Sequence, residues 1–287
     1  MPYLTELPLM GLEKIGIIPK KWDHRKEREQ NYEWELIRKF SSKNSIAVTG
    51  QMIETYSKPG DHVLDPMCGI GTMVVESIAR KRQGYGLDIY PAQVETTLVN
   101  CKKTVLTNQN SGRYKVIWDP RGAEFIPDHF SNYSMDLVIF SPPYGVQNHH
   151  SGKTKKQRAF IERKKLYSCQ RYSKEEENEE AIEHDVSRGC TALSRFYEKM
   201  APITKATVDV LKTRGHVILI LQDYIRKGKP IGLVQAFINM YLADERIQGV
   251  GYYTRELHPT HFKQMQHGRG NITVCVEHTI VFKKERI

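Results

Sequence analysis

The chain has 287 residues, with 43 Lys and Arg against 33 Asp and Glu, a formal net charge of +10 and a pI near 9.2. This length suits one domain with insertions or two small domains, and a hydrophobic content of 39% argues against wholesale disorder. The mean hydropathy is −0.53, and no apolar run approaches the roughly 20 residues that span a bilayer. The basic excess favours an anionic partner, nucleic acid first.

The N-terminal residues lack a basic stretch followed by an apolar one, so we expect no signal peptide. An odd, scattered set of cysteines without CxxC spacing favours a reducing compartment, and we expect a cytoplasmic protein with no membrane contact. The cysteines are Cys68, Cys101, Cys169, Cys190 and Cys275. His149, His150 and His184 lie near two of them, but the spacing matches no ligand pattern, so we expect no metal site.

Hydrophobic periodicity predicts helices and strands that alternate along most of the chain. Residues 20–40 are predicted to form a charged helix with Trp34, Ile37 and Phe40 on an apolar stripe, and residues 45–58 a short helix before the turn 58–61. The predicted strands that follow cover residues 62–68, 85–89, 114–118, 135–140, 216–223, 250–256 and 271–284, and the predicted helices cover residues 71–82, 91–106, 193–212 and 230–244. This alternation is typical of an α/β fold with a doubly wound, mostly parallel sheet. The last two strands are expected to pair antiparallel.

Residues 145–192 interrupt this pattern without a periodic apolar signal, as functional or disordered insertions do. The basic segment 151–174 interleaves nine cations with Phe160, Tyr167 and Tyr172, which suits phosphate contact and base stacking, although a solvated charged helix would look similar. The candidate nucleic-acid contacts are Lys153, Lys155, Lys156, Arg158, Arg163, Lys164, Lys165 and Arg171, with Lys263, His267 and Arg269 from residues 258–271. Residues 175–185 hold seven acids, and we expect this block to mask the basic segment until DNA displaces it.

The segment VLDPMCGIGT (63–72) places Asp65 at the carboxyl end of a predicted strand and two glycines before a predicted helix. Gly69 and Gly71 allow a tight turn and a close approach of the backbone to a ligand, with Thr72 near the helix start. Gly-x-Gly alone is a weak signal, because a dinucleotide-binding fold or a plain strand-to-helix turn would contain it as well.

An acidic residue lies at or directly after the carboxyl end of each of the next two predicted strands. Asp88 lies where a carboxylate can accept both ribose hydroxyls of a nucleoside, but a helix follows at once, so Asp88 could instead cap that helix. Asp119 is a candidate neighbour of an adenine ring or, alternatively, an ordinary loop carboxylate.

The strand 135–140 leads into Ser141-Pro142-Pro143-Tyr144. The two prolines donate no N–H and hold the backbone extended, so that their carbonyls point outward, and Tyr144 offers a flat face. Alternatively, the two prolines have no role in a site and only end the strand.

Together these segments resemble the amino-group DNA methyltransferases that use S-adenosylmethionine. DPMCGIGT is similar to the family's DPFxGxGT cofactor motif, with Met67 where Phe is usual, and SPPY to its catalytic [DNS]PP[YFW] motif. The resemblance runs from about Ser45 to the closing strand HTIVFKK and covers neither the insertion nor the first 40 or so residues. It implies a class I Rossmann-like fold. The cofactor contacts that it implies are Ser45, Asp65, Pro66, Met67, Cys68, Gly69, Gly71, Thr72, Asp88, Ile89 and Asp119.

The resemblance also implies catalytic roles for Ser141, Pro142, Pro143 and Tyr144. An exocyclic amine held by the Ser141 hydroxyl and the Pro142 carbonyl would attack the sulfonium methyl in line, so that Cys68 need not act as a nucleophile. The target base would be flipped out of the duplex and stacked on Tyr144. Within the family, Ser before the prolines favours cytosine N4 over adenine N6.

We therefore expect a site-specific DNA methyltransferase that forms N4-methylcytosine in a bacterial, archaeal or viral cytoplasm. It would act as a monomer or homodimer on duplex DNA, in a restriction–modification system with a possible cognate restriction endonuclease. The alternatives are a DNA adenine-N6 methyltransferase, a tRNA guanine-N2 methyltransferase and a catalytically silent nucleic-acid-binding protein. The tRNA enzymes normally carry an N-terminal RNA-binding domain, for which the 60 or so residues before the cofactor strand are too few. The expected parts are an N-terminal helical segment (1–60), a cofactor-binding and catalytic half (61–144), a target-recognition insertion (145–192) and a second half (193–287).

Overall fold

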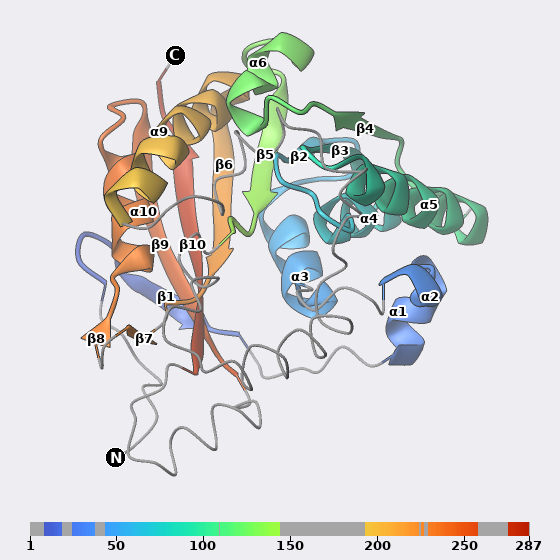
Figure 1. Cartoon of the computed structure of the whole chain (residues 1–287), viewed down its shortest axis with the longest axis horizontal. Coiled ribbons are helices and arrows are strands. Elements are labelled where there is room, and N and C mark those ends of the chain that lie inside the picture. The colour runs from blue at the N-terminus through green and yellow to red at the C-terminus, as the bar shows by residue number, and fades with distance from the viewer. Residues whose placement is uncertain are drawn as a thin grey trace, which may run out of the picture.

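The computed structural model describes residues 9–18, 25–37, 44–108, 110–143, 193–223, 225–226, 229–257 and 275–286. Its centre is an eight-stranded sheet (Figure 1). The strands of this sheet are β1 (Lys14–Ile17), β2 (His62–Asp65), β3 (Gln83–Asp88), β4 (Tyr114–Trp118), β5 (Met135–Phe140), β6 (Leu211–Leu221), β9 (Ile247–Glu256) and β10 (Val276–Lys284). A separate small hairpin consists of β7 (Ile225–Arg226) and β8 (Lys229–Pro230).

The strands lie in the order β1-β9-β10-β6-β5-β2-β3-β4. Neighbouring strands are parallel, except that β10 runs antiparallel to both β6 and β9. The predicted doubly wound, mostly parallel sheet with an antiparallel last strand is therefore confirmed. The chain runs from β2 outward to β4 and then returns to β5 on the other side of β2. The β2–β5 pair is thus the topological switch point, where open α/β sheets bind ligands.

Helices cover both faces of the sheet (Figure 1). They are α1 (Arg25–Asn31), α2 (Trp34–Ile37), α3 (Ile46–Tyr56), α4 (Thr72–Ala79), α5 (Pro91–Thr107), the 3-10 turn η1 (Ala123–Phe125), α6 (Ile126–His129), α9 (Leu193–Val210) and α10 (Leu233–Leu242). Side chains of β5 alternate between two cores, as the two-residue period of a strand requires. Val138 and Phe140 belong to the core that includes α9 and α10, whereas Leu137 and Ile139 belong to the core that includes α3.

The charged helix predicted for residues 20–40 is wrong, because the structure has two short helices, α1 and α2, in its place. The interruption has a physical cause. The backbone N–H of Glu33 donates to the side-chain oxygen of Asn100 (2.9 Å), so this N–H does not continue the hydrogen bonds of α1. Tyr32 is fully buried, with its hydroxyl donating to Glu76 (2.9 Å). Ile37 is buried as expected, and Phe40 lies outside the described residues.

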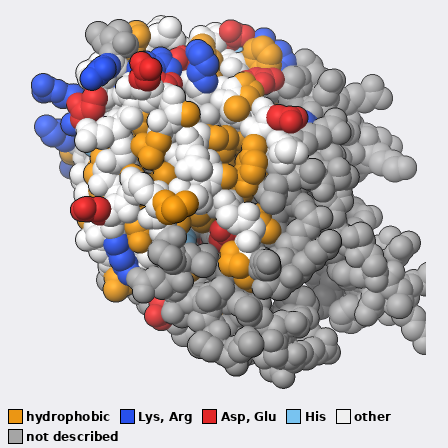
Figure 2. Space-filling model, turned by 90° about the vertical axis from the view of Figure 1, so that its left-hand side faces the viewer, with side chains coloured by type: hydrophobic (Ala, Val, Ile, Leu, Met, Phe, Trp, Pro, Cys, Tyr) orange, Lys and Arg blue, Asp and Glu red, His pale blue; other side chains and the backbone are white. Residues whose placement is uncertain are grey.

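The description of residues 1–60 as helical also needs correction, since β1 pairs in parallel with β9 at the far edge of the sheet. Ile15 and Ile17 are exposed, so this strand lacks the buried apolar face on which strand prediction depends. Figure 2 shows the side of the molecule where β1, β9 and α10 lie, with apolar side chains scattered over it and charged side chains mostly near its margin. The elements predicted between residues 62 and 140 lie within a few residues of their observed bounds, while η1 and α6 have no predicted counterpart.

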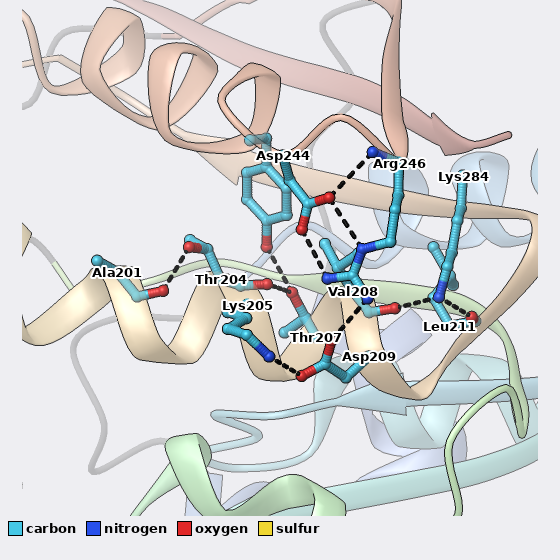
Figure 3. A network of polar contacts seen from close by, with 11 residues as sticks. Ala201, Thr204, Lys205, Thr207, Val208, Asp209, Leu211, Asp244, Arg246 and Lys284 are labelled. Carbon is cyan, nitrogen blue, oxygen red and sulfur yellow. Dashed lines mark hydrogen bonds and ion pairs between the residues drawn. The ribbon is translucent and has the colours of Figure 1, made fainter. Parts of the chain in front are cut away.

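A buried lysine closes the carboxyl end of α9 (Figure 3). The Lys284 side chain is fully buried, and its Nζ donates to the carbonyl oxygens of Val208 (2.7 Å) and Leu211 (2.8 Å). Burial lowers the pKa of Lys284 to about 8. Beside it, Arg246 donates to both Asp244 and Asp209. The carbonyl of Val208 near the end of α9 and that of Leu211 at the start of β6 are therefore satisfied by Lys284, while the carbonyls of Asp209 and Val210 accept the backbone N–H groups of Tyr133 and Ser134.

We expect Lys284→Met to lower the free energy of unfolding by about 3 kcal/mol, because two buried carbonyls lose their donor. Chemical denaturation measures this change. The matched control is Lys283→Met, which removes only the ion pair with the partly exposed Glu285 (2.6 Å) and should change the free energy of unfolding by about 0.5 kcal/mol or less. Equal losses in the two variants would contradict the capping role.

Candidate functional site

The carboxyl ends of β2, β3, β4 and β5 lie along one edge of the sheet. Asp65 and Asp88 are the last residues of β2 and β3, Asp119 follows β4 directly, and Ser141 follows β5 directly. The structure therefore brings these four predicted site residues to the same edge. Tyr144, the basic segment and residues 258–271 lie outside the described residues, so their predicted roles stay predictions.

The turn between β2 and α4 depends on two glycines. Gly69 and Gly71 have φ of +52° and +84°, a left-handed conformation that favours glycine. A Cβ atom on Gly71 would lie 2.5 Å from Cγ2 of Thr97, and one on Gly69 would lie 3.2 Å from Oε1 of Gln93. This glycine turn, residues 66–71, therefore packs its backbone directly against α5.

Asp88 ties the end of β3 to the glycine turn. Its carboxylate accepts the N–H of Gly69 (2.8 Å) and the N–H of Tyr90 (3.0 Å). The residue that caps α5 is Tyr90 rather than Asp88. The predicted alternative in which Asp88 is the helix cap is therefore not the observed arrangement. Ile89, beside it, is half-buried, and its carbonyl accepts the indole N–H of Trp118 (3.1 Å).

Asp65 is almost completely buried, and its Oδ1 accepts the N–H of Met67 (3.0 Å). Burial raises the pKa of Asp65 to about 8, and the negative charge of Asp88 acts in the same direction against the Met67 hydrogen bond. The carboxyl of Asp65 is thus largely protonated at neutral pH in the unliganded site. A bound cationic group would favour its ionised form.

Cys68 is buried against the backbone of Gly86, since a Cβ on Gly86 would lie 3.1 Å from its sulfur. Burial raises the pKa of the Cys68 thiol well above its usual value. Such a thiol is a poor nucleophile, which agrees with the expectation that Cys68 need not act as one. Pro66 and Thr72 are buried as well, and Met67 is half-buried.

Asp119 is engaged by its own loop. Its carboxylate accepts hydrogen bonds from the backbone N–H, Nε and Nη2 of Arg121 and from Nε2 of His129 (2.6 Å). Burial raises the pKa of Asp119, but the hydrogen bonds from Arg121 and His129 outweigh it, and the net shift is downward. With two acceptor positions on each oxygen, these bonds occupy the carboxylate. The geometry favours the loop-carboxylate interpretation of Asp119.

Ser45 is the N-cap of α3, and its hydroxyl accepts the N–H of Val48 (3.4 Å). Thr49, in the first turn of α3, donates to the sulfur of Met73 in the first turn of α4 (3.2 Å). The starts of the two helices therefore lie side by side, which places Ser45 in the neighbourhood of the glycine turn. Its predicted contact with a cofactor stays a prediction.

Ser141, Pro142 and Pro143 leave the sheet at the switch point. β5 pairs with β2 through Val63–Leu137 and Leu64–Val138, so these three residues continue the strand next to Asp65. Pro142 is buried, while Ser141 and Pro143 are half-buried. Within the described part of the chain the Ser141 hydroxyl forms no hydrogen bond.

Several residues of the site were not identified by the sequence analysis. Thr97 and Asn100 on α5 donate to carbonyls of the glycine turn, and Arg121 and His129 hold Asp119. One signal was present: the buried face of α5 carries Thr97, Asn100 and Thr104, where an amphipathic helix would place apolar residues. Buried polar side chains need partners, and here the turn supplies them.

The strand order, the glycine turn and the acidic strand ends define a class I Rossmann-like methyltransferase fold. Residues 13–99 match the N6_N4_Mtase family, described as DNA methylase. This match supports an assignment to the amino-group DNA methyltransferases and, with the fold, indicates S-adenosylmethionine as the cofactor. The buried carboxyl of Asp65 and the N–H of Ile70, which no described residue accepts, suit a ligand that carries a cationic group and a carboxylate.

Over 95 residues the chain is 30% identical to a probable tRNA (guanine(10)-N2)-dimethyltransferase of Methanothermococcus thermolithotrophicus, a match over 33% of this chain and 57% of that protein. The chain thus matches just over half the length of this relative. Among solved structures, a SAM-dependent methyltransferase of Methanosarcina mazei is 13% identical with a TM-score of 0.48, over 82% of this chain and 98% of that one. TrmN of Thermus thermophilus is 12% identical with a TM-score of 0.46, over 88% of this chain and 52% of that one.

Two further findings concern the described residues alone. None of their helices combines the length and the apolar character needed to cross a membrane. They also contain no group of three or more His, Cys, Asp or Glu side chains that could hold a metal ion.

We expect Gly71→Ala to weaken the binding of S-adenosylhomocysteine at least tenfold, because the added methyl meets Thr97 and the left-handed backbone becomes strained. Isothermal titration calorimetry measures the dissociation constant. The matched control is Gly60→Ala, since Gly60 also has a positive φ (+91°) but has open space around its Cα. An equal loss of affinity in both variants would contradict the role of the turn.

The pKa of Asp65 predicts a pH dependence of stability. The folded protein holds a proton on Asp65 up to about pH 8, whereas the unfolded chain releases it near its ordinary value of 3.8. Between these values the folded state binds more protons, so Asp65 makes stability fall as pH rises, by up to about 1.4 kcal/mol per pH unit. We expect unliganded Asp65→Asn to lose this slope and to become more stable than the wild type at pH 8. Denaturation at pH 5 to 8 tests this, and parallel curves for the two proteins would contradict it.

Proposed function

We propose that the protein transfers the methyl group of S-adenosylmethionine to the exocyclic amine of a nucleic-acid base, with cytosine N4 in duplex DNA as the target. The observation that carries this proposal is the position of Ser141-Pro142-Pro143. These residues follow β5 at the switch point of the sheet, beside the strand that ends in Asp65 and leads into the glycine turn. An acceptor-rich segment thus lies next to the proposed cofactor site.

The chemistry follows from the groups present. The lone pair of an exocyclic amine is delocalised into the ring, so the amine is a weak nucleophile. The Ser141 hydroxyl and the Pro142 carbonyl each accept one N–H of the amine, which returns electron density to the nitrogen and orients its lone pair. When bound, S-adenosylmethionine supplies an electrophilic methyl group. The nitrogen forms one bond to this methyl while the carbon–sulfur bond breaks, and the amine then loses one proton to solvent.

DNA is favoured as the substrate by the family match, which concerns DNA methylases. Cytosine is favoured by the resemblance, because Ser rather than Asp precedes the two prolines, as is usual for the cytosine-N4 members of the family. In a duplex the base must first be flipped out. The proposal assigns duplex contacts to the basic segment and to residues 258–271, and it includes a cytoplasmic setting and a possible cognate restriction endonuclease.

A tRNA guanine-N2 methyltransferase is the second candidate. It is favoured by the 95-residue match to a probable tRNA (guanine(10)-N2)-dimethyltransferase. Guanine N2 is also an exocyclic amine, so the same acceptors would serve it. The two candidates differ in substrate rather than in chemistry, and a substrate assay separates them.

We expect labelled methyl transfer from S-adenosylmethionine to duplex DNA, with N4-methylcytosine detected by nucleoside mass spectrometry. Single-stranded DNA and tRNA are the parallel substrates. We expect Ser141→Ala to lower kcat at least about 100-fold while S-adenosylhomocysteine still binds, because an acceptor of the amine is lost. Detection of N6-methyladenine in DNA would show that adenine, and not cytosine, is the target base. Detection of N2-methylguanosine in tRNA would establish the second candidate.

The matched control is Ser134→Ala at the opposite end of β5, where the Ser134 hydroxyl is buried without a hydrogen-bond partner among the described residues. This variant should retain wild-type activity. A fully active Ser141→Ala protein would refute the proposed role of Ser141. No methyl transfer to any of the three substrates would refute the proposed function as a whole.

A further inference from the structure

We propose that Thr97, a buried residue of α5, is a positioning residue that orients the peptide groups of the glycine turn for cofactor binding. Its hydroxyl donates to the carbonyl oxygen of Gly69 at 2.7 Å. The next polar residue on the same helix face, Asn100, donates its side-chain N–H to the carbonyl oxygen of Ile70 at 2.9 Å. Two consecutive carbonyls of the turn are thus held on the side of α5.

This arrangement determines where the N–H groups of the turn point. In a planar trans peptide the C=O and the N–H point in opposite directions. Because the Gly69 carbonyl faces α5, the N–H of Ile70, which belongs to the same peptide group, points away from α5. The N–H of Gly69 is used by Asp88 and that of Gly71 by the carbonyl of Cys68.

The N–H of Ile70 therefore differs from its two neighbours. No described residue accepts a hydrogen bond from it, although the residue is buried. A backbone N–H oriented in this way suits an anionic or carbonyl oxygen of a ligand. If the peptide between Gly69 and Ile70 rotated, this donor would turn inward and the carbonyl would face the ligand instead, which would repel an anion.

Thr97 also limits the space available for such a rotation. The methyl and hydroxyl groups of Thr97 approach Gly71 so closely that a Cβ there would lie 2.5 Å and 2.8 Å from them. Asn100 is braced from the other side, because its side-chain oxygen accepts the N–H of Glu33. The turn is consequently held by side chains that need not touch the cofactor, and this inference rests on the cofactor assignment made above.

The test compares Thr97→Val, Thr97→Ser and Thr104→Val in the full chain. Valine keeps the shape of threonine but has no donor, whereas serine keeps the donor. Thr104 lies on the same helix face, and its hydroxyl donates to Asn31 and Asn100 rather than to the turn. We expect Thr97→Val to raise the dissociation constant of S-adenosylhomocysteine about tenfold, and Thr97→Ser and Thr104→Val to change it less than threefold.

Amide hydrogen exchange of residues 66–72 in the unliganded protein provides a second readout that is independent of the cofactor. Exchange of this peptide should become about tenfold faster in Thr97→Val and stay within twofold of the wild type in Thr104→Val. Wild-type affinity together with wild-type exchange in Thr97→Val would overturn the inference, as would equal effects of Thr97→Val and Thr104→Val. If the wild-type protein failed to bind S-adenosylhomocysteine, the cofactor assignment would fail, and the exchange data would still decide whether Thr97 holds the turn.

Discussion

The close approach of helix α4 to strand β3 is the constraint on which the candidate site depends. A Cβ atom on Gly84 would lie 2.9 Å from the carbonyl oxygen of Val74, and one on Gly86 would lie 3.0 Å from Cγ2 of the same residue. Larger residues at these two positions of β3 would push α4 away from the sheet. They would also displace the glycine turn, which leads into the start of α4. Because Gly71 also contacts Thr97, the turn is enclosed between β3 and α5. The shape of the site is thus set by backbone contacts that only glycine permits.

The three strand ends place carboxylates in different electrostatic surroundings. Asp119 pairs with Arg121 and accepts a hydrogen bond from His129, and Asp88 accepts two backbone N–H groups. Asp65 has one N–H donor and is buried, so its pKa is raised to about 8. The carboxyl group with the least compensation therefore lies at the end of β2, beside β5. Binding of a cationic group at this position would favour the ionised form of Asp65.

Strong local signals explain which parts of the fold were predictable from the sequence. The strands 114–118 and 135–140 were predicted with their observed bounds, because each is a short apolar or β-branched run between turns. The helix break after Tyr32 was not predictable, since it depends on Asn100, 67 residues further along the chain from Glu33. Strand β1 has exposed apolar side chains and forms only through pairing with β9. The motif residues of the site were found, whereas the side chains that hold them were not, because those contacts are made between distant segments.

Strand β1 and helix α1 are part of the fold rather than an attachment to it. The family match begins at residue 13 and ends at residue 99, so it includes β1, the glycine turn and about half of α5. The carboxyl end of α1 is joined to the part of α5 just beyond this span, where Lys103 and Thr104 donate to the carbonyls of Tyr32 and Asn31. The Ser-Pro-Pro segment lies beyond the match, at the end of β5. The glycine turn is therefore supported by both sequence and geometry, whereas the proposed choice of base rests on Ser141 and the sequence motif that contains it.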